Sequence, residues 1–134
     1  MTRIFTVADY TRPNGETVER TVIHQTTEAA LVVWHLLPGQ EIPPHRHPAG
    51  QDTWTVVSGE ADYLLGDGKS RAIKVGDVAI AAIGQIHGAR NRGGEPFVFV
   101  SVVSPAEAGY ELIMTLPPSK ASDSSGDYAA GACR

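Results

Sequence analysis

The chain has 134 residues, 42% of them hydrophobic, and a formal net charge of −4. This length predicts one domain that can bury a core without the help of disulfides, and the single cysteine excludes a disulfide within the chain. No basic patch favours nucleic acid, no secretory signal is visible, and no apolar run approaches the ~20 residues that span a membrane. We therefore predict a cytoplasmic protein that binds neither nucleic acid nor membranes.

Short apolar runs separated by glycine and proline predict an all-β domain with minimal helix. A tight turn at Gly66-Asp67-Gly68 predicts a hairpin. One short helical turn is expected at 104–107, where Ser-Pro-Ala-Glu has the residues of a capping box. In chain order, the expected strands cover residues 17–23, 31–37, 54–57, 61–65, 72–75, 78–83, 87–91, 97–103 and 110–116.

The strand pattern places a single domain at residues 1–116. From Pro117 onward the sequence becomes rich in Ser, Gly, Asp and Ala, which predicts a flexible C-terminal tail at residues 117–134. Cys133 lies in this tail, so we expect an incidental exposed thiol rather than a nucleophile.

Two histidines one residue apart, His45 and His47, are followed five positions later by Asp52. Because strand side chains alternate between faces, the two imidazoles point the same way and can close on one ion if the strand bends. Asp52 would then enter after a turn and add an oxygen ligand. Taken alone, the pair does not decide between a metal site and a chance arrangement on a loop.

The spacing of these residues, and of a second cluster downstream, resembles the two motifs of the cupin superfamily. The first motif is a glycine, five residues, His-x-His, three or four residues, glutamate, six residues and glycine, matched here by Gly39, His45, His47, Asp52 and Gly59. The second is a glycine, five residues, Pro-x-Gly, two residues, histidine, three residues and asparagine, matched by Gly76, Ala82, Gly84, His87 and Asn91. Aspartate replaces the glutamate, and alanine replaces the proline. The motif core spans residues 39–91 and is similar to that of small single-domain cupins.

The resemblance implies a double-stranded β-helix, a jelly-roll barrel, that holds one divalent transition metal inside. Carried over by position, the ligands are His45, His47, Asp52 and His87. Imidazoles with a carboxylate suit Fe, Mn, Ni, Cu or Zn. Aspartate is one methylene shorter than glutamate, so either its strand sits closer to the ion or Asp52 binds through water.

Gln51 is the alternative fourth ligand, because a gap of three residues after His47 also fits the motif. Asp52 is favoured because it keeps the six-residue gap to the next glycine. It also shares a strand face with the bulky apolar residues Trp54 and Val56, which predicts that it points inward. Gln51 would then support the ligands from outside the coordination sphere.

Four other side chains are weaker candidates for the site. Trp54 and Tyr63 are candidates for a pocket wall, and Trp54 is favoured because it shares the face of Asp52. His35 is expected to be a hydrogen-bonded core or interface residue, and His24 is expected at the surface.

The resemblance leaves several functions open, because similar proteins include dioxygenases, isomerases, lyases, decarboxylases and sugar-binding regulators. We predict an enzyme that acts on a small molecule at a mononuclear metal centre, with a dioxygenase, and thus an oxidoreductase, favoured. The alternatives are a metal-dependent isomerase or lyase, which needs a separate base such as Tyr63 or His35, and a non-catalytic cupin that binds a small molecule. No lysine falls within either motif, which favours a compact, weakly charged substrate.

A homodimer is also expected. Residues 31–37 are apolar on both faces, and a barrel has only one interior, so the outer face needs cover from the N-terminal segment or from a partner subunit.

Overall fold

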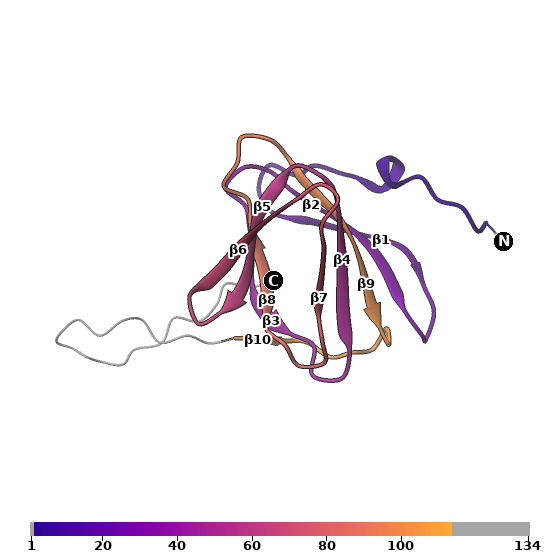
Figure 1. The fold of residues 1–134 in the computed structure, drawn as a ribbon. Helices are drawn as coiled ribbons and strands as arrows, with labels where there is room; N and C mark the ends of the chain where they lie inside the picture. Colours follow the sequence, from indigo (N-terminus) through magenta and orange to yellow (C-terminus); the bar gives the residue numbers. More distant parts are fainter. Residues whose placement is uncertain (1, 114–134) are drawn as a thin grey trace.

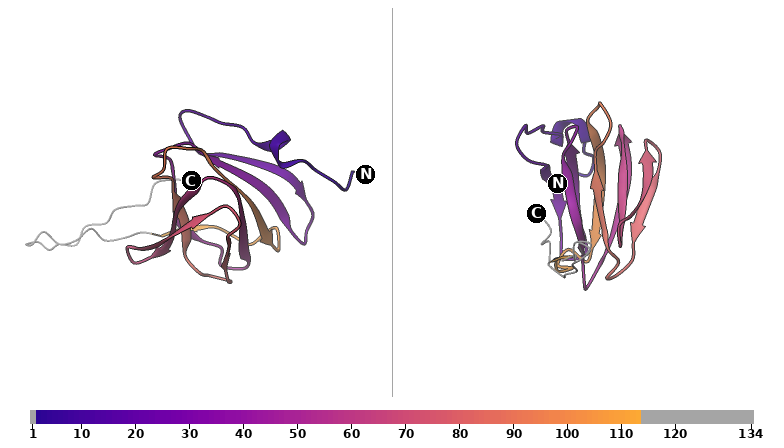
Figure 2. Two further views of the ribbon diagram at one scale, coloured as in Figure 1. Left: turned by 45° about the horizontal axis from the view of Figure 1, so that its top comes forward. Right: turned by 90° about the vertical axis from the view of Figure 1, so that its left-hand side faces the viewer.

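Ten strands in two antiparallel sheets make up most of residues 2–113, the part of the chain that this computed structural model describes (Figure 1). The first sheet has the order β1 (Glu19–Gln25), β2 (Ala30–Leu36), β9 (Phe97–Ser104), β4 (Gln51–Ser58), β7 (Val78–Ala81). The second has the order β10 (Glu111–Leu112), β3 (Glu41–Arg46), β8 (His87–Arg90), β5 (Glu60–Gly66), β6 (Lys69–Lys74). The sheets face each other around one interior, as Figure 2 shows from two further sides. The predicted all-β jelly roll is therefore confirmed.

The predicted hairpin joins β5 to β6, and Gly66, Asp67 and Gly68 all have positive φ angles there. The strand expected at 110–116 is present at Glu111–Leu112. The remainder of that strand from residue 114, the predicted tail at 117–134 and Cys133 lie outside the described residues.

The helical turn predicted at 104–107 is wrong. Ser104 is the last residue of β9 and pairs with Gln51 of β4. Its hydroxyl donates to the carbonyl oxygen of Glu28 at 3.1 Å, whereas a capping serine would accept a backbone N–H. Sheet pairing therefore overrides the local capping signal. Within residues 2–113, the one helical element is the short 3₁₀ helix η1 (Val7–Tyr10), which the sequence did not reveal.

Strand β2 is covered on both faces, as the apolar run predicted. Val32 and Leu36 point into the barrel, and Val33 and His35 on the opposite face are also buried. The segment before β1 lies beside this sheet, and η1 packs against β1 (Figure 1). There the ring of Phe5 lies 6.0 Å from that of His24.

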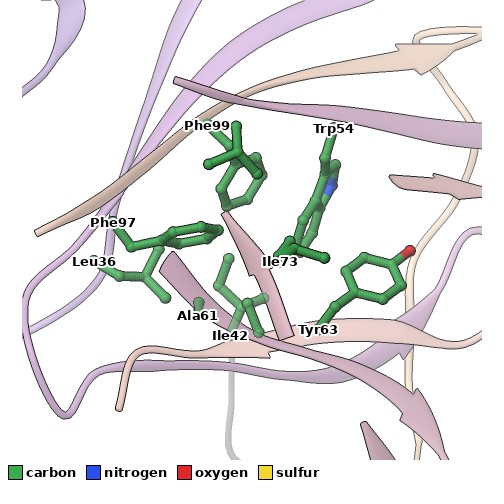
Figure 3. Close-up of a cluster of buried hydrophobic side chains, with 10 residues drawn as sticks. Leu36, Ile42, Trp54, Ala61, Tyr63, Ile73, Phe97 and Phe99 are labelled. Carbon is green, nitrogen blue, oxygen red and sulfur yellow. The ribbon is translucent and has the colours of Figure 1, made fainter. Parts of the chain in front are cut away.

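Large side chains fill one end of the barrel interior (Figure 3). The rings of Trp54 and Phe99 stack at 3.9 Å between centroids, and Tyr63 meets Trp54 edge-on at 5.1 Å. Each fully buried large apolar side chain contributes about 1.5–3 kcal/mol to stability. We call this cluster the filled end; it comprises Leu36, Ile42, Trp54, Val56, Ala61, Tyr63, Ile73, Ala89, Phe97 and Phe99.

One residue from each motif holds the chain around the filled end. The Asn91 side-chain amide donates to the carbonyl oxygens of Leu36 and Glu95, at 3.0 and 2.9 Å, and so fixes the end of β8 against β2. Gly59 has a φ of 77°, and a Cβ there would collide with the carbonyl of Pro96. Both residues position strands rather than react.

Smaller side chains occupy the opposite end of the interior: Ala30, Val32, Val103 and Ala108. They leave a cavity of about 810 Å³ between β1 and β2 on one side and β3 with residues 106–110 on the other. We call this the hollow end. Among the described residues, no helix is long and apolar enough to cross a membrane.

Candidate metal centre

Four side chains converge where the filled end meets the hollow end. His45 lies on β3 and pairs directly with His87 of β8, His47 follows the end of β3, and Asp52 lies near the start of β4. Their ligand atoms all lie within 4.8 Å of one another. The register of β3 shifts between Ile42 and His45, so the strand is irregular just before the two histidines. The four residues named from the sequence are thus brought together, and the group could hold a metal ion.

Backbone carbonyls orient all three imidazoles in the same way. The Nδ1 atoms of His45, His47 and His87 lie 2.9, 2.8 and 3.1 Å from the carbonyl oxygens of Pro43, Gly109 and Gln85. A carbonyl oxygen only accepts, so each Nδ1 carries the proton and donates. In the neutral ring, Nε2 is then left with its lone pair free for a ligand bond.

The Nε2 lone pairs create a need for positive charge at the centre. Nε2 of His47 and Nε2 of His87 lie 3.3 and 3.0 Å from Oδ2 of Asp52. A neutral imidazole lone pair and a carboxylate oxygen are both acceptors, so a cation must satisfy them, either a proton on the ring or a metal ion. This donor set therefore fits a divalent transition metal.

Asp52 is held from its other side by Ser101. The Ser101 hydroxyl donates to Oδ1 of Asp52 at 2.6 Å, and both residues are buried. Ser101 lies on β9, directly opposite Trp54 in the sheet. One carboxylate oxygen is thus fixed by the barrel wall while the other faces the histidines, so the shorter side chain of aspartate still reaches the group.

The surroundings of Asp52 and His45 favour the protonation states that bind metals. Burial alone would raise the pKa of Asp52, but hydrogen bonds from His47, His87 and Ser101 lower it by more, so this pKa lies well below its usual range. Burial, followed by the neighbouring His87, lowers the pKa of His45 to about 4. At neutral pH the site therefore contains a carboxylate and a neutral imidazole at His45.

The pKa of His47 shifts in the direction opposite to that of His45. Burial lowers its pKa, but its hydrogen bonds with Asp52 and with the Gly109 carbonyl raise the pKa by more, so the net shift is upward. Arg20, which lines the hollow end, opposes this shift through its positive charge. A proton therefore competes with a metal ion at His47 more than at His45.

Trp54 and Tyr63 have different positions relative to the site. The Trp54 ring lies 5.7 Å from the His87 ring and lines the cavity, so it forms an apolar wall behind the group. Tyr63 belongs to the filled end and does not line the cavity (Figure 3). Burial raises the pKa of Tyr63 far above its ordinary value, which leaves it a poor proton acceptor at neutral pH.

The remaining sequence candidates lie outside the group. Gln51 is exposed, whereas Asp52 is buried, as the alternation along β4 predicted. His35 is buried on the outer face of β2, where its Nδ1 has no hydrogen-bond partner among the described residues. His24 lies beside Phe5 rather than at the centre.

Three cavity or site residues were missed from the sequence. Tyr110 stacks on His45 with 5.1 Å between ring centroids, but it lies far downstream of both motifs. Arg20 lies on an edge strand with weak alternation. Ser101 could have been found, because it is the single polar residue among the inward positions of the apolar strand Phe97–Ser104.

Comparisons with known proteins place this architecture in a family. A family model described as "Cupin domain" matches residues 32–103, which include all four residues of the group and more than half of the chain. The chain is a cupin. No curated protein matches the sequence.

Solved structures similar to this cupin share its double-stranded β-helix. An uncharacterised conserved protein with a double-stranded β-helix domain from Klebsiella pneumoniae has 54% identity and a TM-score of 0.81, with 84% of this chain and 97% of that chain covered. A Thermus thermophilus protein has 25% identity and a TM-score of 0.73, with coverages of 78% and 99%. A predicted oxalate decarboxylase from Thermotoga maritima has 25% identity and a TM-score of 0.62, with coverages of 66% and 80%.

Proposed function

We propose that this cupin binds one divalent transition metal through His45, His47, Asp52 and His87, and that the loaded protein is an oxygenase acting on a small molecule. The observation that carries this proposal is the convergence of four ligand atoms within 4.8 Å beside a cavity of about 810 Å³. Four protein ligands would leave two positions on a six-coordinate ion. A substrate that binds through one atom and dioxygen could then be held close together, with one position for each.

Fe(II) and Mn(II) are the favoured ions, and Ni, Cu and Zn also accept imidazole and carboxylate ligands. When bound, such an ion supplies Lewis acidity and, for Fe and Mn, one-electron redox chemistry. Asp52 offsets part of its charge, and Ser101 keeps that carboxylate in place. Trp54 excludes water from the side that faces the filled end. The Thermotoga relative described as a predicted oxalate decarboxylase supports a small-molecule substrate.

Oxygen uptake tests the oxygenase directly. The protein is loaded with Fe(II) without oxygen, mixed with a catechol, a thiol or a β-dicarbonyl, and then exposed to oxygen. We expect substrate-dependent uptake with one class, and loss of that uptake in His45→Ala. Binding of an unaltered compound with no uptake for any class would contradict an oxygenase and support the non-catalytic, ligand-binding alternative.

An isomerase or lyase is the second candidate, and Tyr110 is the observation that favours it. Its ring lines the cavity and stacks on His45, so we infer that Tyr110 would transfer the proton in such an enzyme. Such an enzyme would convert substrate in the absence of oxygen, and Tyr110→Phe would lower turnover far more than metal content. Oxygen-dependent turnover that survives in Tyr110→Phe would exclude this candidate.

We also propose that the protein is a homodimer. On the outer face of the first sheet, Val78 and Ile80 of β7 are 56% and 61% exposed and lie beside Thr53 and Thr55 of β4. An uncharged, β-branched sheet surface of this kind is typical of a contact between subunits. Light scattering at micromolar concentration should give twice the chain mass, and Ile80→Asp should give the monomer. A monomeric wild-type protein would contradict the proposal.

A further inference from the structure

The hollow end contains a cation that neither cupin motif includes. Among the described residues that line the cavity, Arg20 is the one lysine or arginine. Arg20 is exposed at the mouth of the cavity. Two glutamates also line the cavity, but Glu41 is paired with Arg90 at 2.8 Å, and Glu16 lies outside the sheets, before β1. Arg20 therefore sets the positive charge available to a molecule in the cavity.

The position of Arg20 on β1 directs it toward the cavity. It lies directly opposite Trp34 of β2, and Trp34 lines the same cavity. The guanidinium carbon lies 6.0 Å from the centroid of the Trp34 ring, and that ring stacks on Phe99 of the filled end. This cation–π contact with an anchored indole leaves the N–H donors of the guanidinium, which lie in its plane, available to a ligand.

Among the residues that the structure describes, no carboxylate neutralises Arg20. Within residues 2–113 it forms no ion pair, although Arg46, Arg90 and Arg92 each pair with an acidic side chain. Arg20 and His47 nevertheless line the same cavity. A molecule long enough to touch both Arg20 and the histidines would therefore meet a cation at one end and the candidate metal ligands at the other.

The wall between these two ends is apolar and made of small side chains. Ala30, Val32, Val103 and Ala108 line it, and none of them offers a hydrogen bond to a second charged group. An arginine binds a carboxylate with two parallel hydrogen bonds. One cation and an apolar wall fit a molecule with one carboxylate and an apolar body, whereas a phosphate ester or a dicarboxylate would bring more negative charge than one arginine balances.

We propose that Arg20 is a specificity-determining residue of this cupin, and that the cavity takes an organic monocarboxylate whose carboxylate pairs with Arg20 while its other end reaches the group His45, His47, Asp52 and His87. This substrate class rests on the proposed metal-dependent function. It narrows the weakly charged substrate expected from the sequence to a monoanion.

A matched pair of probes tests the proposal: 3,4-dihydroxyphenylacetate and its neutral amide, which share a metal-chelating catechol and differ only in the carboxylate. Calorimetric titration of Zn(II)-loaded protein avoids redox chemistry. We expect the acid to bind about 10–100-fold more tightly than the amide, as a charge-assisted, bidentate pair allows. In Arg20→Gln this preference should disappear through weaker binding of the acid alone, and Arg20→Lys should keep part of it.

Arg71→Gln is the control, because Arg71 is exposed on β6 of the other sheet and does not line this cavity. It should bind both probes as the wild type does. Equal affinity of the wild type for acid and amide, no measurable binding of the acid, or an unchanged preference in Arg20→Gln would each overturn the proposal. If the wild type retains no Zn(II) but still prefers the acid, and Arg20→Gln removes that preference, the role of Arg20 holds while the metal-dependent function fails.

Discussion

The two ends of the barrel interior are built from the same strands but hold different contents. Along β9, the inward positions change from Phe97 and Phe99 at the filled end to Ser101 at the candidate centre and Val103 at the hollow end. Along β4, they change from Val56 through Trp54 to Asp52. Inward and outward side chains alternate from Asp52 to Val56 in β4 and from Phe97 to Val103 in β9. The size and polarity of the inward residues therefore determine where the interior is filled, where it is charged and where it is open.

The comparison explains how a small barrel holds a polar cluster. Large rings at the filled end bury the apolar area that stabilises the fold. The site lies at the boundary, where Trp54 shields it on one side and the cavity admits a ligand on the other. Stability and binding are therefore assigned to different ends of the same interior.

Removing side-chain volume should lower the free energy of unfolding most at the filled end. We expect Phe99→Ala to lower the free energy of unfolding by about 3–5 kcal/mol, because the ring is fully buried between Trp54 and Phe97 and the space cannot close. Val103→Ala at the hollow end should cost about 1–2 kcal/mol, because it enlarges an existing cavity. Urea unfolding followed by circular dichroism measures both. Equal losses would show that the two ends do not differ in packing.

Removing the carboxylate should affect binding more than stability. Asp52→Ala removes a charged ligand. It should therefore weaken metal binding by more than the loss of a residue that only supports a ligand, which costs roughly 10–100-fold in affinity. Gln51→Ala is the matched control on the outward face of β4, and it should bind metal within about twofold of the wild type. Competition titration against a chelator gives both affinities. A larger effect at Gln51 would refute the assignment of the fourth ligand.

The hydroxyl that holds Asp52 should have an intermediate effect. Ser101→Ala leaves Oδ1 of Asp52 without its donor, so we expect metal affinity to fall by about 10–100-fold. Ser104→Ala is the control on the same strand, because its hydroxyl binds the Glu28 carbonyl at the exposed end of β9. The same chelator titration applies. Similar affinities for the two variants would mean that Ser101 does not position the carboxylate.

The outer surface next to the site should matter least. Arg46 lies between the two histidines in sequence but points outward, where it pairs with Glu111 at 2.8 Å on an exposed surface. Arg46→Ala should change the free energy of unfolding by about 0.2–1 kcal/mol and leave metal affinity unchanged. A large loss of metal would indicate that the inside and the outside of β3 are coupled.

Sequence reasoning recovered what depends on local periodicity and motif spacing. Alternation along β4 separated Asp52 from Gln51, and the two motifs named all four residues that the fold brings together. It failed where a distant contact decides the outcome. The capping signal at Ser104 was overridden by pairing with β4, and Arg20 and Tyr110 reach the cavity only because β1 and the segment before β10 face each other across it. Contacts between segments so far apart in the chain cannot be seen in a single stretch of sequence.

Metal content tests the central claim most directly. Purified protein is loaded with Fe(II), Mn(II) or Zn(II), dialysed and measured by elemental analysis, with thermal unfolding as a check that each variant is folded. We predict one ion per chain in the wild type and in the control His24→Ala, and a sharp loss in His45→Ala, His47→Ala and His87→Ala. One ion per chain retained in all three of these folded variants would contradict the metal centre.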